Sequence, residues 1–215
     1  MEDVHIILGA PETEDLKALI KSPGVVIGVD RGALIAIKEG ITLDIALGDF
    51  DSVSTDEKLK VQEHTKEMHN FPTNKDDTDA ELALLYVLDN LTSANIYLYN
   101  WAGGRIDHLY SLLMLVLQER FLPLVSRIQF IAGDNQISYY LPGEYKLEKI
   151  DRMTYLSLVL LTKVEKLTLS NVSYPLKEAD FALPRALISN EFISHQARLS
   201  FDEGIIAVIQ SRDVS

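Results

Sequence analysis

Two aspartates near residue 50 form the first group of side chains that could take part in chemistry. Asp49 and Asp51 stand two residues apart in Gly48-Asp49-Phe50-Asp51-Ser52. Residues at this spacing in an extended segment point to the same side, where two carboxylates repel each other unless a cation neutralises them. Hard carboxylate oxygens suit Mg²⁺ that is shared with phosphate. The alternative is a turn in which an Asp caps the structure that follows, and the pair alone does not decide between the two readings.

A second acidic group, Asp76-Asp77-Thr78-Asp79, leads into a segment with helical apolar spacing. Thr78 and Glu81 have the spacing of a capping box, and acids stabilise a helix N-terminus. Helix capping explains one or two acidic residues here, but it does not explain three of them in a chain that also carries the pair Asp49 and Asp51. We therefore expect Asp79 to bind a metal or substrate, and Lys75 either to meet a phosphate or to balance its acidic neighbours.

A glycine-rich turn, Gly103-Gly104-Arg105-Ile106-Asp107-His108, opens another predicted helix. Two glycines let the backbone approach a ligand closely, and a helix N-terminus attracts anions. Arg105 can grip phosphate oxygens with its planar guanidinium. The alternative is a surface loop in which Arg105 pairs with Asp107.

Short buried strands must position these groups. Apolar runs predict strands at residues 6–8, 25–29, 45–47, 96–99 and 128–131, and helical spacing predicts helices at about 79–90 and 108–119. Alternating strands and helices indicate a mostly parallel sheet covered on both faces. Asp30, Asp49 and the segment from Asn100 each follow a predicted strand, so they should share the ligand-binding edge of the sheet.

The pattern changes near residue 133. Beyond it the sequence predicts strands at 137–141, 155–161, 164–169, 197–201 and 205–210, separated by turn signals, with no convincing helix. We therefore expect an α/β fold in which an N-terminal, mostly parallel α/β sheet domain (1–133) precedes a smaller all-β, sandwich-like C-terminal domain (134–215).

The composition of the chain limits the classes of partner that we expect it to bind. The formal net charge of −12 disfavours nucleic acid and anionic membranes as partners, and no segment has the roughly 18 apolar residues of a membrane span. The chain has no cysteine, which excludes disulfides and thiolate chemistry and suits a cytoplasmic location. It also lacks the G-x-x-x-x-G-K-[ST] and G-x-G-x-x-G phosphate-binding motifs, so a nucleotide must be held through metal and the Gly-Gly-Arg turn.

In this order, the clusters resemble the thiamine pyrophosphokinase family. The matching stretches are VDRGA at 29–33, LGDFDSV at 47–53, FPTNKDDTDAELAL at 71–84 and GGRIDH at 103–108, with a weaker match in ISNEF at 188–192 and in EGIIAVIQS at 203–211. The sequence departs from the usual family residues at Arg31, at Asn100-Trp101 and at 184–187.

The resemblance implies a homodimeric enzyme that converts thiamine and ATP to thiamine diphosphate and AMP with Mg²⁺. It places the metal-binding acids at Asp49, Asp51 and Asp79, which would be catalytic together with Arg105 and Asp107. We expect nucleotide or phosphate contacts from Asp30, Lys75, Thr78, Gly103, Gly104 and Arg105, and thiamine contacts from Asp107, Ser189 and Asn190. Asp107 would orient the thiamine hydroxyl or accept its proton. Trp101 either stacks on a substrate ring or packs at the domain junction.

Two other functions remain open on the sequence alone. Asp49-Phe50-Asp51-Ser52-Val53 after an apolar strand partly imitates the nucleophile motif of an aspartyl-phosphate phosphatase. A thiamine- or nucleotide-binding sensor without turnover would also retain these clusters.

Overall fold

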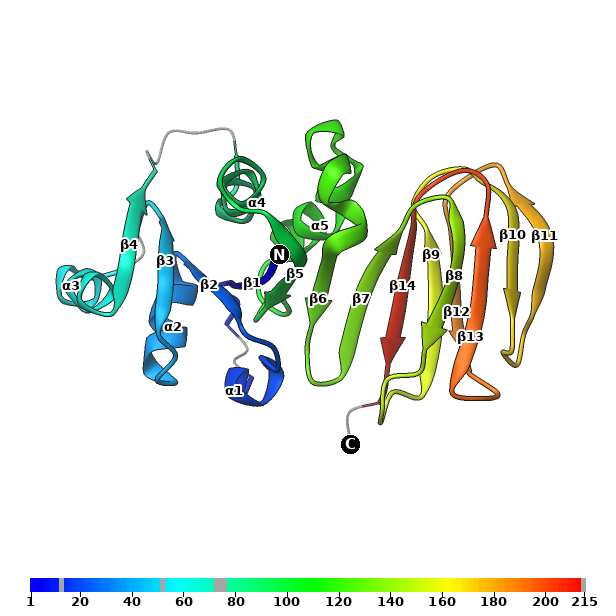
Figure 1. Ribbon diagram of the computed structural model, residues 1–215, viewed down its shortest axis with the longest axis horizontal. Coiled ribbons are helices and arrows are strands. Elements are labelled where there is room, and N and C mark those ends of the chain that lie inside the picture. The colour runs from blue at the N-terminus through cyan, green and yellow to red at the C-terminus, as the bar shows by residue number, and fades with distance from the viewer. Residues whose placement is uncertain (12–13, 51–52, 72–76, 214–215) are drawn as a thin grey trace. The chain divides into compact units, whose positions relative to one another are not determined.

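The computed structural model describes residues 1–11, 14–50, 53–71 and 77–213. They fall into two compact units, Met1–Ala132 and Gly133–Ser215. The first unit combines helices with parallel strands and the second is built from antiparallel strands (Figure 1). The predicted fold class, α/β followed by all-β, is confirmed.

Six parallel strands form the sheet of the first unit. In the order β6-β5-β1-β2-β3-β4 they are β6 (Ile128–Ile131), β5 (Ser93–Tyr99), β1 (Glu2–Ile7), β2 (Gly24–Val29), β3 (Leu43–Gly48) and β4 (Thr65–Asn70). The chain moves outward from β1 to β4 and then returns to the other side of β1 with β5. This reversal makes the gap between β1 and β5 the topological switch point, where ligands of such sheets bind beyond the strand ends.

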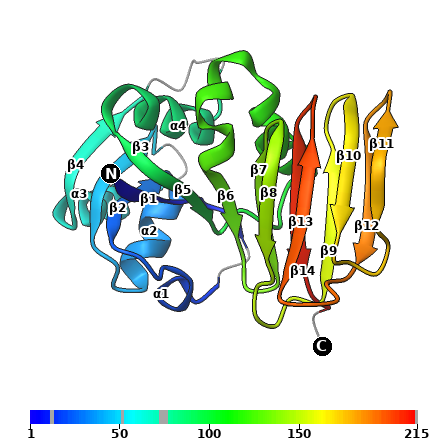
Figure 2. The same cartoon turned by 45° about the vertical axis from the view of Figure 1, so that its right-hand side comes forward.

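Helices cover the sheet of the first unit. On one face α1 (Leu16–Leu19), α2 (Arg31–Lys38) and α3 (Thr55–Glu63) bury Leu16, Ala36 and Val61 in one apolar cluster with Ile7 and Ala46. The return to β5 uses α4 (Asp79–Asn90), which contacts β2 and β3. Right-handed crossovers place α4 on the opposite face from α2, as Figures 1 and 2 show. The connection to β6 runs through α5 (Ile106–Met114) and two 3₁₀ segments, η1 (Leu115–Leu117) and η2 (Glu119–Arg127).

Two antiparallel sheets form the second unit. One pairs β12 (Arg185–Asn190), β9 (Tyr155–Leu160), β14 (Ile206–Ser211) and β7 (Asn135–Tyr140). The other pairs β11 (Leu176–Phe181), β10 (Val164–Ser170), β13 (Gln196–Phe201) and β8 (Gly143–Glu148). Alternate residues of both, such as Leu158 and Val208 from the first and Leu169 and Phe201 from the second, share one apolar core, as in a sandwich.

Four strands were not predicted, namely β4, β8, β11 and β12. Each is at the end of its strand order and has only one strand neighbour within the described residues. An edge strand is exposed along one side, so its sequence need not show the apolar run of a central strand. The helix predicted at about 108–119 begins earlier, at Ile106, and tightens into a 3₁₀ turn at Leu115.

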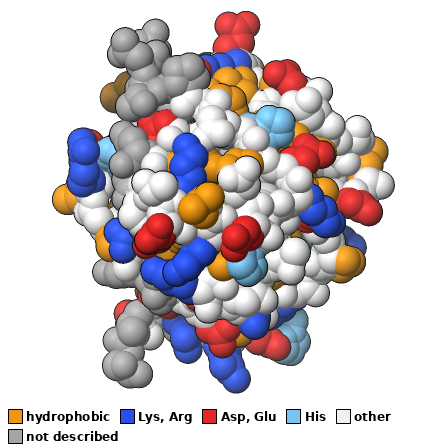
Figure 3. Space-filling view, turned by 90° about the vertical axis from the view of Figure 1, so that its left-hand side faces the viewer, with side chains coloured by type: hydrophobic (Ala, Val, Ile, Leu, Met, Phe, Trp, Pro, Cys, Tyr) orange, Lys and Arg blue, Asp and Glu red, His pale blue; other side chains and the backbone are white. Residues whose placement is uncertain are grey.

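Charged side chains of both signs are interspersed on the face of the first unit that carries α3 and β4 (Figure 3). One ion pair there, Lys66 Nζ to Asp44 Oδ1 at 2.6 Å, joins β4 to β3. Over the described residues no single helix is long and apolar enough to cross a membrane; Ile106–Leu117 with Glu119–Arg127 passes that test only as a pair bent by 91°.

Candidate functional site

A cavity of about 520 Å³ opens at the carboxyl ends of β1, β2 and β5, beside the topological switch point. Its walls come from the segments that follow these strands and from the first turns of α4 and α5. The lining residues in the described part of the chain are Leu8, Gly9, Ala10, Pro11, Val29, Asp30, Arg31, Thr78, Asp79, Ala80, Asn100, Trp101, Gly103, Gly104, Arg105, His108, Leu109 and Leu112. Residues that the sequence separates by about 70 positions, Asp30 and Gly103, therefore meet at one site.

Three non-glycine residues near the carboxyl ends of β2, β3 and β5 have positive φ angles, as do five described non-glycine residues of the second unit. Asp30, Phe50 and Asn100 follow β2, β3 and β5, and their φ angles are 46°, 54° and 51°. Positive φ is unfavourable for residues other than glycine and recurs at functional sites, where the surrounding structure holds it in place. Asn100 shows how: its buried side-chain amide donates to the carbonyls of Leu8 and Ala10 at 2.8 and 2.9 Å.

The Gly-Gly-Arg turn depends on its glycines. Gly103 and Gly104 have φ of 88° and 75°, and a Cβ on Gly104 would lie 3.0 Å from Cδ of Pro11. The turn ends at Arg105, the N-cap of α5, whose side chain does not cap the helix. A close backbone turn followed by a helix N-terminus is an arrangement that attracts anions.

Arg105 and Asp107 form an exposed bidentate pair. Arg105 Nε and Nη2 donate to Asp107 Oδ1 and Oδ2 at 3.1 and 2.6 Å. The hydrogen bonds from Arg105 are the main cause that lowers the pKa of Asp107 to about 2. While the pair persists, Asp107 is a weak base and occupies one edge of the guanidinium, so a bidentate phosphate contact through Nε and Nη2 requires the pair to open.

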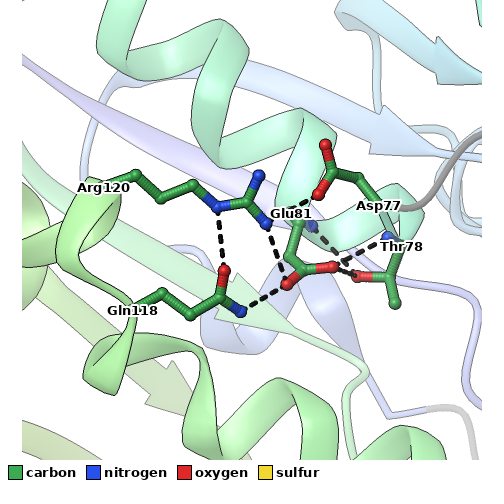
Figure 4. Close-up of polar contacts among 5 residues, drawn as sticks. All are labelled: Asp77, Thr78, Glu81, Gln118 and Arg120. Carbon is green, nitrogen blue, oxygen red and sulfur yellow. Dashed lines mark hydrogen bonds and ion pairs between the residues drawn. The ribbon is translucent and has the colours of Figure 1, made fainter.

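The acidic start of α4 separates into groups with different surroundings (Figure 4). Thr78 and Glu81 form the expected capping box, with Glu81 N donating to Thr78 Oγ1 and Thr78 N donating to Glu81 Oε2. Asp77 and Glu81 both pair with Arg120, at 2.6 and 3.2 Å. Asp79 instead lines the cavity.

Another predicted acid, Asp49, directly follows β3. A Cβ on Gly48 would be 3.1 Å from the Cα of Asp30, which shows how closely the ends of β2 and β3 approach each other just before Asp49. Asp49 is half-buried. Asp51 and Lys75 lie outside the described residues. In the described part of the chain no three His, Asp or Glu side chains gather to hold a metal ion.

Trp101 forms part of the cavity wall and is 9 % exposed. Its indole Nε1 donates to the carbonyl of Ile131 at 3.1 Å, and its ring meets Phe130 edge-on at 5.5 Å. The side chain is thus anchored on β6, and any contact with a substrate would come from the part of the ring that faces the cavity.

Ser189 and Asn190 belong to β12 in the second unit. Ser189 is exposed with φ of 61°, and its backbone N donates to Ser157 Oγ at 3.1 Å. The side chain of Asn190 is buried and hydrogen-bonded in both senses to the backbone of Tyr174, at 2.9 Å each way. In this arrangement Asn190 shapes the segment, while Ser189 presents the exposed hydroxyl.

Sequence reasoning missed several residues of the site. Gly9, Ala10 and Pro11 line the cavity after β1, and a single glycine in the sequence is too weak a signal to predict this. Arg31 was noted only as a departure, yet it lines the cavity at the start of α2. Arg120 and Gln118 had no signal at all, because their acidic partners are 37 or more residues away in sequence.

Comparisons with known proteins agree with this arrangement. The family model described as the thiamin pyrophosphokinase catalytic domain matches residues 16–125, and the vitamin B1 binding domain of the same enzymes matches residues 144–206. Thiamine pyrophosphokinase of Bacillus subtilis (strain 168) is 31 % identical over 217 residues, covering 99 % of this chain and 100 % of the relative.

Solved structures show the same similarity. A thiamin pyrophosphokinase family protein from Enterococcus faecalis superposes with a TM-score of 0.90 at 38 % identity, covering 100 % of both chains. The Bacillus subtilis thiamine pyrophosphokinase structure gives 0.88 at 30 % identity, covering 99 % of this chain and 100 % of that one. With a cavity at the switch point, the Gly-Gly-Arg turn beside it and both family models matched, the chain belongs to the thiamine pyrophosphokinase family.

Proposed function

We propose that this chain transfers a pyrophosphoryl group from ATP to the hydroxyl of thiamine, giving thiamine diphosphate and AMP. The observation that carries the proposal is the cavity at the sheet's switch point, which Asp79 and the Gly-Gly-Arg turn line together. The phosphatase alternative requires Asp to act as the nucleophile, and neither the family match nor the cavity favours it.

The residues present suit Mg²⁺. Asp79 lines the cavity and Asp49 follows Gly48, whose backbone lies close to Asp30; both carboxylates offer the hard oxygen ligands that Mg²⁺ prefers. We propose Asp49, Asp51 and Asp79 as the residues that hold it, with phosphate oxygens completing its shell. Bound Mg²⁺ would neutralise phosphate charge that a protein of net charge −12 otherwise repels.

The chain's own groups then act by position and charge. In our proposal the backbone of Gly103 and Gly104 and the N-terminus of α5 hold phosphate oxygens, with Asp30, Thr78 and Lys75 nearby. An arriving phosphate competes with Asp107 for Arg105 and opens their ion pair. Arg105 then stabilises the transferred group, and the released Asp107 orients the thiamine hydroxyl.

Thiamine binding and dimerisation are proposed for the second unit. Ser189 is its candidate thiamine contact. Four large apolar side chains of the stretch 174–193 are exposed by two thirds or more, namely Tyr174, Leu183, Ile188 and Ile193. Exposed apolar groups gathered in one stretch are typical of a protein interface, which supports a homodimer. The lack of cysteine in the chain supports a cytoplasmic location.

The test is to incubate the purified protein with thiamine, ATP and Mg²⁺ and to separate the products. We expect AMP and thiamine diphosphate in equal amounts, and neither in the presence of EDTA. ADP with thiamine monophosphate would make the chain a different kinase. Saturable thiamine binding without any product would make it a sensor.

A further inference from the structure

Arg120, in η2, joins the segment that follows α5 to the start of α4 and is not among the described residues that line the cavity. Its guanidinium pairs through Nη2 with Asp77 Oδ1 at 2.6 Å and Glu81 Oε1 at 3.2 Å, and Nε donates to Gln118 Oε1 at 2.8 Å (Figure 4). Gln118 in turn donates from Nε2 to Glu81 Oε1. Arg120 also lies over the ring of the fully buried Phe121, 4.8 Å from its centroid, which anchors this segment in the core.

These contacts engage both oxygens of Glu81. Oε2 accepts from the backbone and hydroxyl of Thr78, each at 2.8 Å, and Oε1 accepts from Gln118 and Arg120. Burial raises the pKa of Glu81, but the hydrogen bonds from Gln118 and Thr78 and the charge of Arg120 together lower it below its usual value. Glu81 is therefore a charged acceptor for a fixed set of donors that surround the first turn of α4.

The same contacts distinguish the acidic residues that face Arg120 from the one that lines the cavity. Asp77 and Glu81 face Arg120, and neither is among the described residues that line the cavity. Asp79, between them in sequence, lines it. Gln118 stands between η1 and η2 and Arg120 is in η2, so the network ties the first turn of α4 to the segment that follows α5 and η1.

We infer that Arg120 is a positioning residue for Asp79, holding the first turn of α4 so that Asp79 and not its acidic neighbours reaches the metal. The inference rests on the proposed metal-binding role of Asp79. The rival explanation is that Arg120 only stabilises the fold.

For Arg120→Ala, the loss of charge and the loss of positioning predict opposite changes in the metal affinity. Removing the positive charge of Arg120 makes the surroundings of Asp79 more negative, which by Coulomb's law alone tightens the binding of a cation. Loss of positioning weakens it, because residues that orient a metal ligand contribute about 10- to 100-fold to metal affinity or activity. The direction of the change therefore separates the two effects.

The experiment measures Mn²⁺ binding, as a substitute for Mg²⁺, by electron paramagnetic resonance in the full chain with ATP. Asp79→Asn establishes first that Asp79 contributes to the bound metal. For Arg120→Ala we expect an affinity about tenfold weaker than that of the wild type and a lower kcat. Arg120→Lys, which keeps the charge but not the planar fork, should recover only part of the loss.

Two further variants distinguish a loss of positioning from a loss of charge and from a loss of fold stability. Gln118→Leu changes no charge and removes the contacts of Gln118 with Glu81 and Arg120. Like Arg120→Ala, it should weaken Mn²⁺ binding. It also provides the test if Arg120→Ala does not fold. Arg127→Ala is the matched control, because Arg127 lies in the same segment but donates to the carbonyls of Ser93 and Pro123, at 3.0 and 3.1 Å. It should leave Mn²⁺ affinity and kcat at the wild-type values.

Unchanged or tighter Mn²⁺ binding in Arg120→Ala, with only a lower melting temperature, would overturn the inference. So would Mn²⁺ binding that Asp79→Asn does not alter. If Mn²⁺ binds through Asp79 and depends on Arg120 but no thiamine diphosphate forms, the proposed function fails and the inference about Arg120 stands.

Discussion

The ion pair between Arg105 and Asp107 decides what each residue can do at neutral pH. Both side chains are exposed, and the pair at 2.6 Å leaves Asp107 charged and weakly basic. Phosphate competes directly for the same guanidinium fork, since carboxylate and phosphate both match its geometry. Of the two roles that the family resemblance implies for Asp107, we therefore expect it to orient the substrate hydroxyl and not to accept its proton.

We expect Arg105→Gln to lower kcat by about 10²–10³, the usual loss when one well-placed electrostatic group is removed. Without Arg105 the pKa of Asp107 should rise from about 2 toward the ordinary value of about 3.9. Both values lie far below neutrality, so the profile of kcat between pH 6 and 9 should keep its shape. Steady-state kinetics against pH check this, with the exposed Arg152→Gln as control. A new titration near neutral pH in the variant would contradict the assigned role.

Glu81→Gln should destabilise the protein at pH 7. The carboxylate accepts at both oxygens, whereas an amide accepts at one, so a buried donor loses its partner at a cost of about 1–3 kcal/mol. Each kcal/mol corresponds to about 2–4 °C in melting temperature for a chain of this size.

The same substitution has a defined pH dependence. The folded state lowers the pKa of Glu81, so its contribution is complete above the unfolded pKa of about 4.3 and is lost as the pH falls through the folded value. The difference in melting temperature between wild type and Glu81→Gln should therefore shrink as the pH drops below about 4.3. The neighbouring exposed residue gives the control, Glu119→Gln, which should change stability little at any pH. A difference that is constant from pH 7 to pH 3 would argue against a charged Glu81.

At the scale of elements, the site consists of strand ends and helix starts held in unfavourable backbone conformations. Asp30 and Asn100 have positive φ directly after β2 and β5, Phe50 has it two residues after β3, and Gly103 and Gly104 continue the pattern. Parallel strands bring these segments to one edge, and the helices that follow direct their N-termini toward the same cavity. The geometry of the cavity thus depends on turns whose conformations are costly to maintain.

Gly104→Ala should impair turnover beyond its effect on stability. A left-handed residue costs about 1–2 kcal/mol when it gains a Cβ, and this Cβ would also press on Pro11 across the cavity mouth at 3.0 Å. Displacing the turn by even about 1 Å can reduce turnover by up to 10²-fold.

Gly40→Ala provides the matched control. Gly40 has φ of 68° and follows α2, and its added Cβ would meet only Lys17 Nζ at 3.1 Å, the end of a flexible side chain. Calorimetry should show similar destabilisation for the two variants, and kinetics should show a loss of kcat in Gly104→Ala alone. Equal kcat values in both would mean that the turn does not position phosphate.

At the scale of the whole molecule, the second unit has a group of exposed apolar side chains. The second unit buries a core shared by its two sheets yet leaves Tyr174, Leu183, Ile188 and Ile193 exposed on or beside β11 and β12. Ser189, the candidate thiamine contact, lies in the same stretch. A dimer interface there would adjoin a substrate-binding segment.

Leu183→Asp should shift the protein toward monomers, because a charge placed in an apolar interface loses its water on association. Light scattering coupled to size-exclusion chromatography over a range of concentrations measures this. Leu59→Asp, on α3 of the first unit and also exposed, is the matched control and should leave the mass unchanged. A wild-type protein that is monomeric throughout, or an equal effect of both substitutions, would exclude this surface as the interface.

The sequence by itself determined the fold class and the residue types of the site, because both are local properties. Apolar runs identify central strands, a capping box identifies the start of α4, and glycines identify a turn with positive φ. It did not reveal the edge strands β4, β8, β11 and β12, since one-sided exposure removes the apolar signal.

Only the tertiary structure decided how these residues are divided among roles. The sequence favours Asp79 as a ligand and gives Glu81 a capping role, but it does not show that Arg120, 39 residues beyond Glu81, pairs with Asp77 and Glu81 while Asp79 lines the cavity. The position and charge state of an acid depend on partners that the fold brings together from distant parts of the chain, and no local pattern of residues specifies those partners.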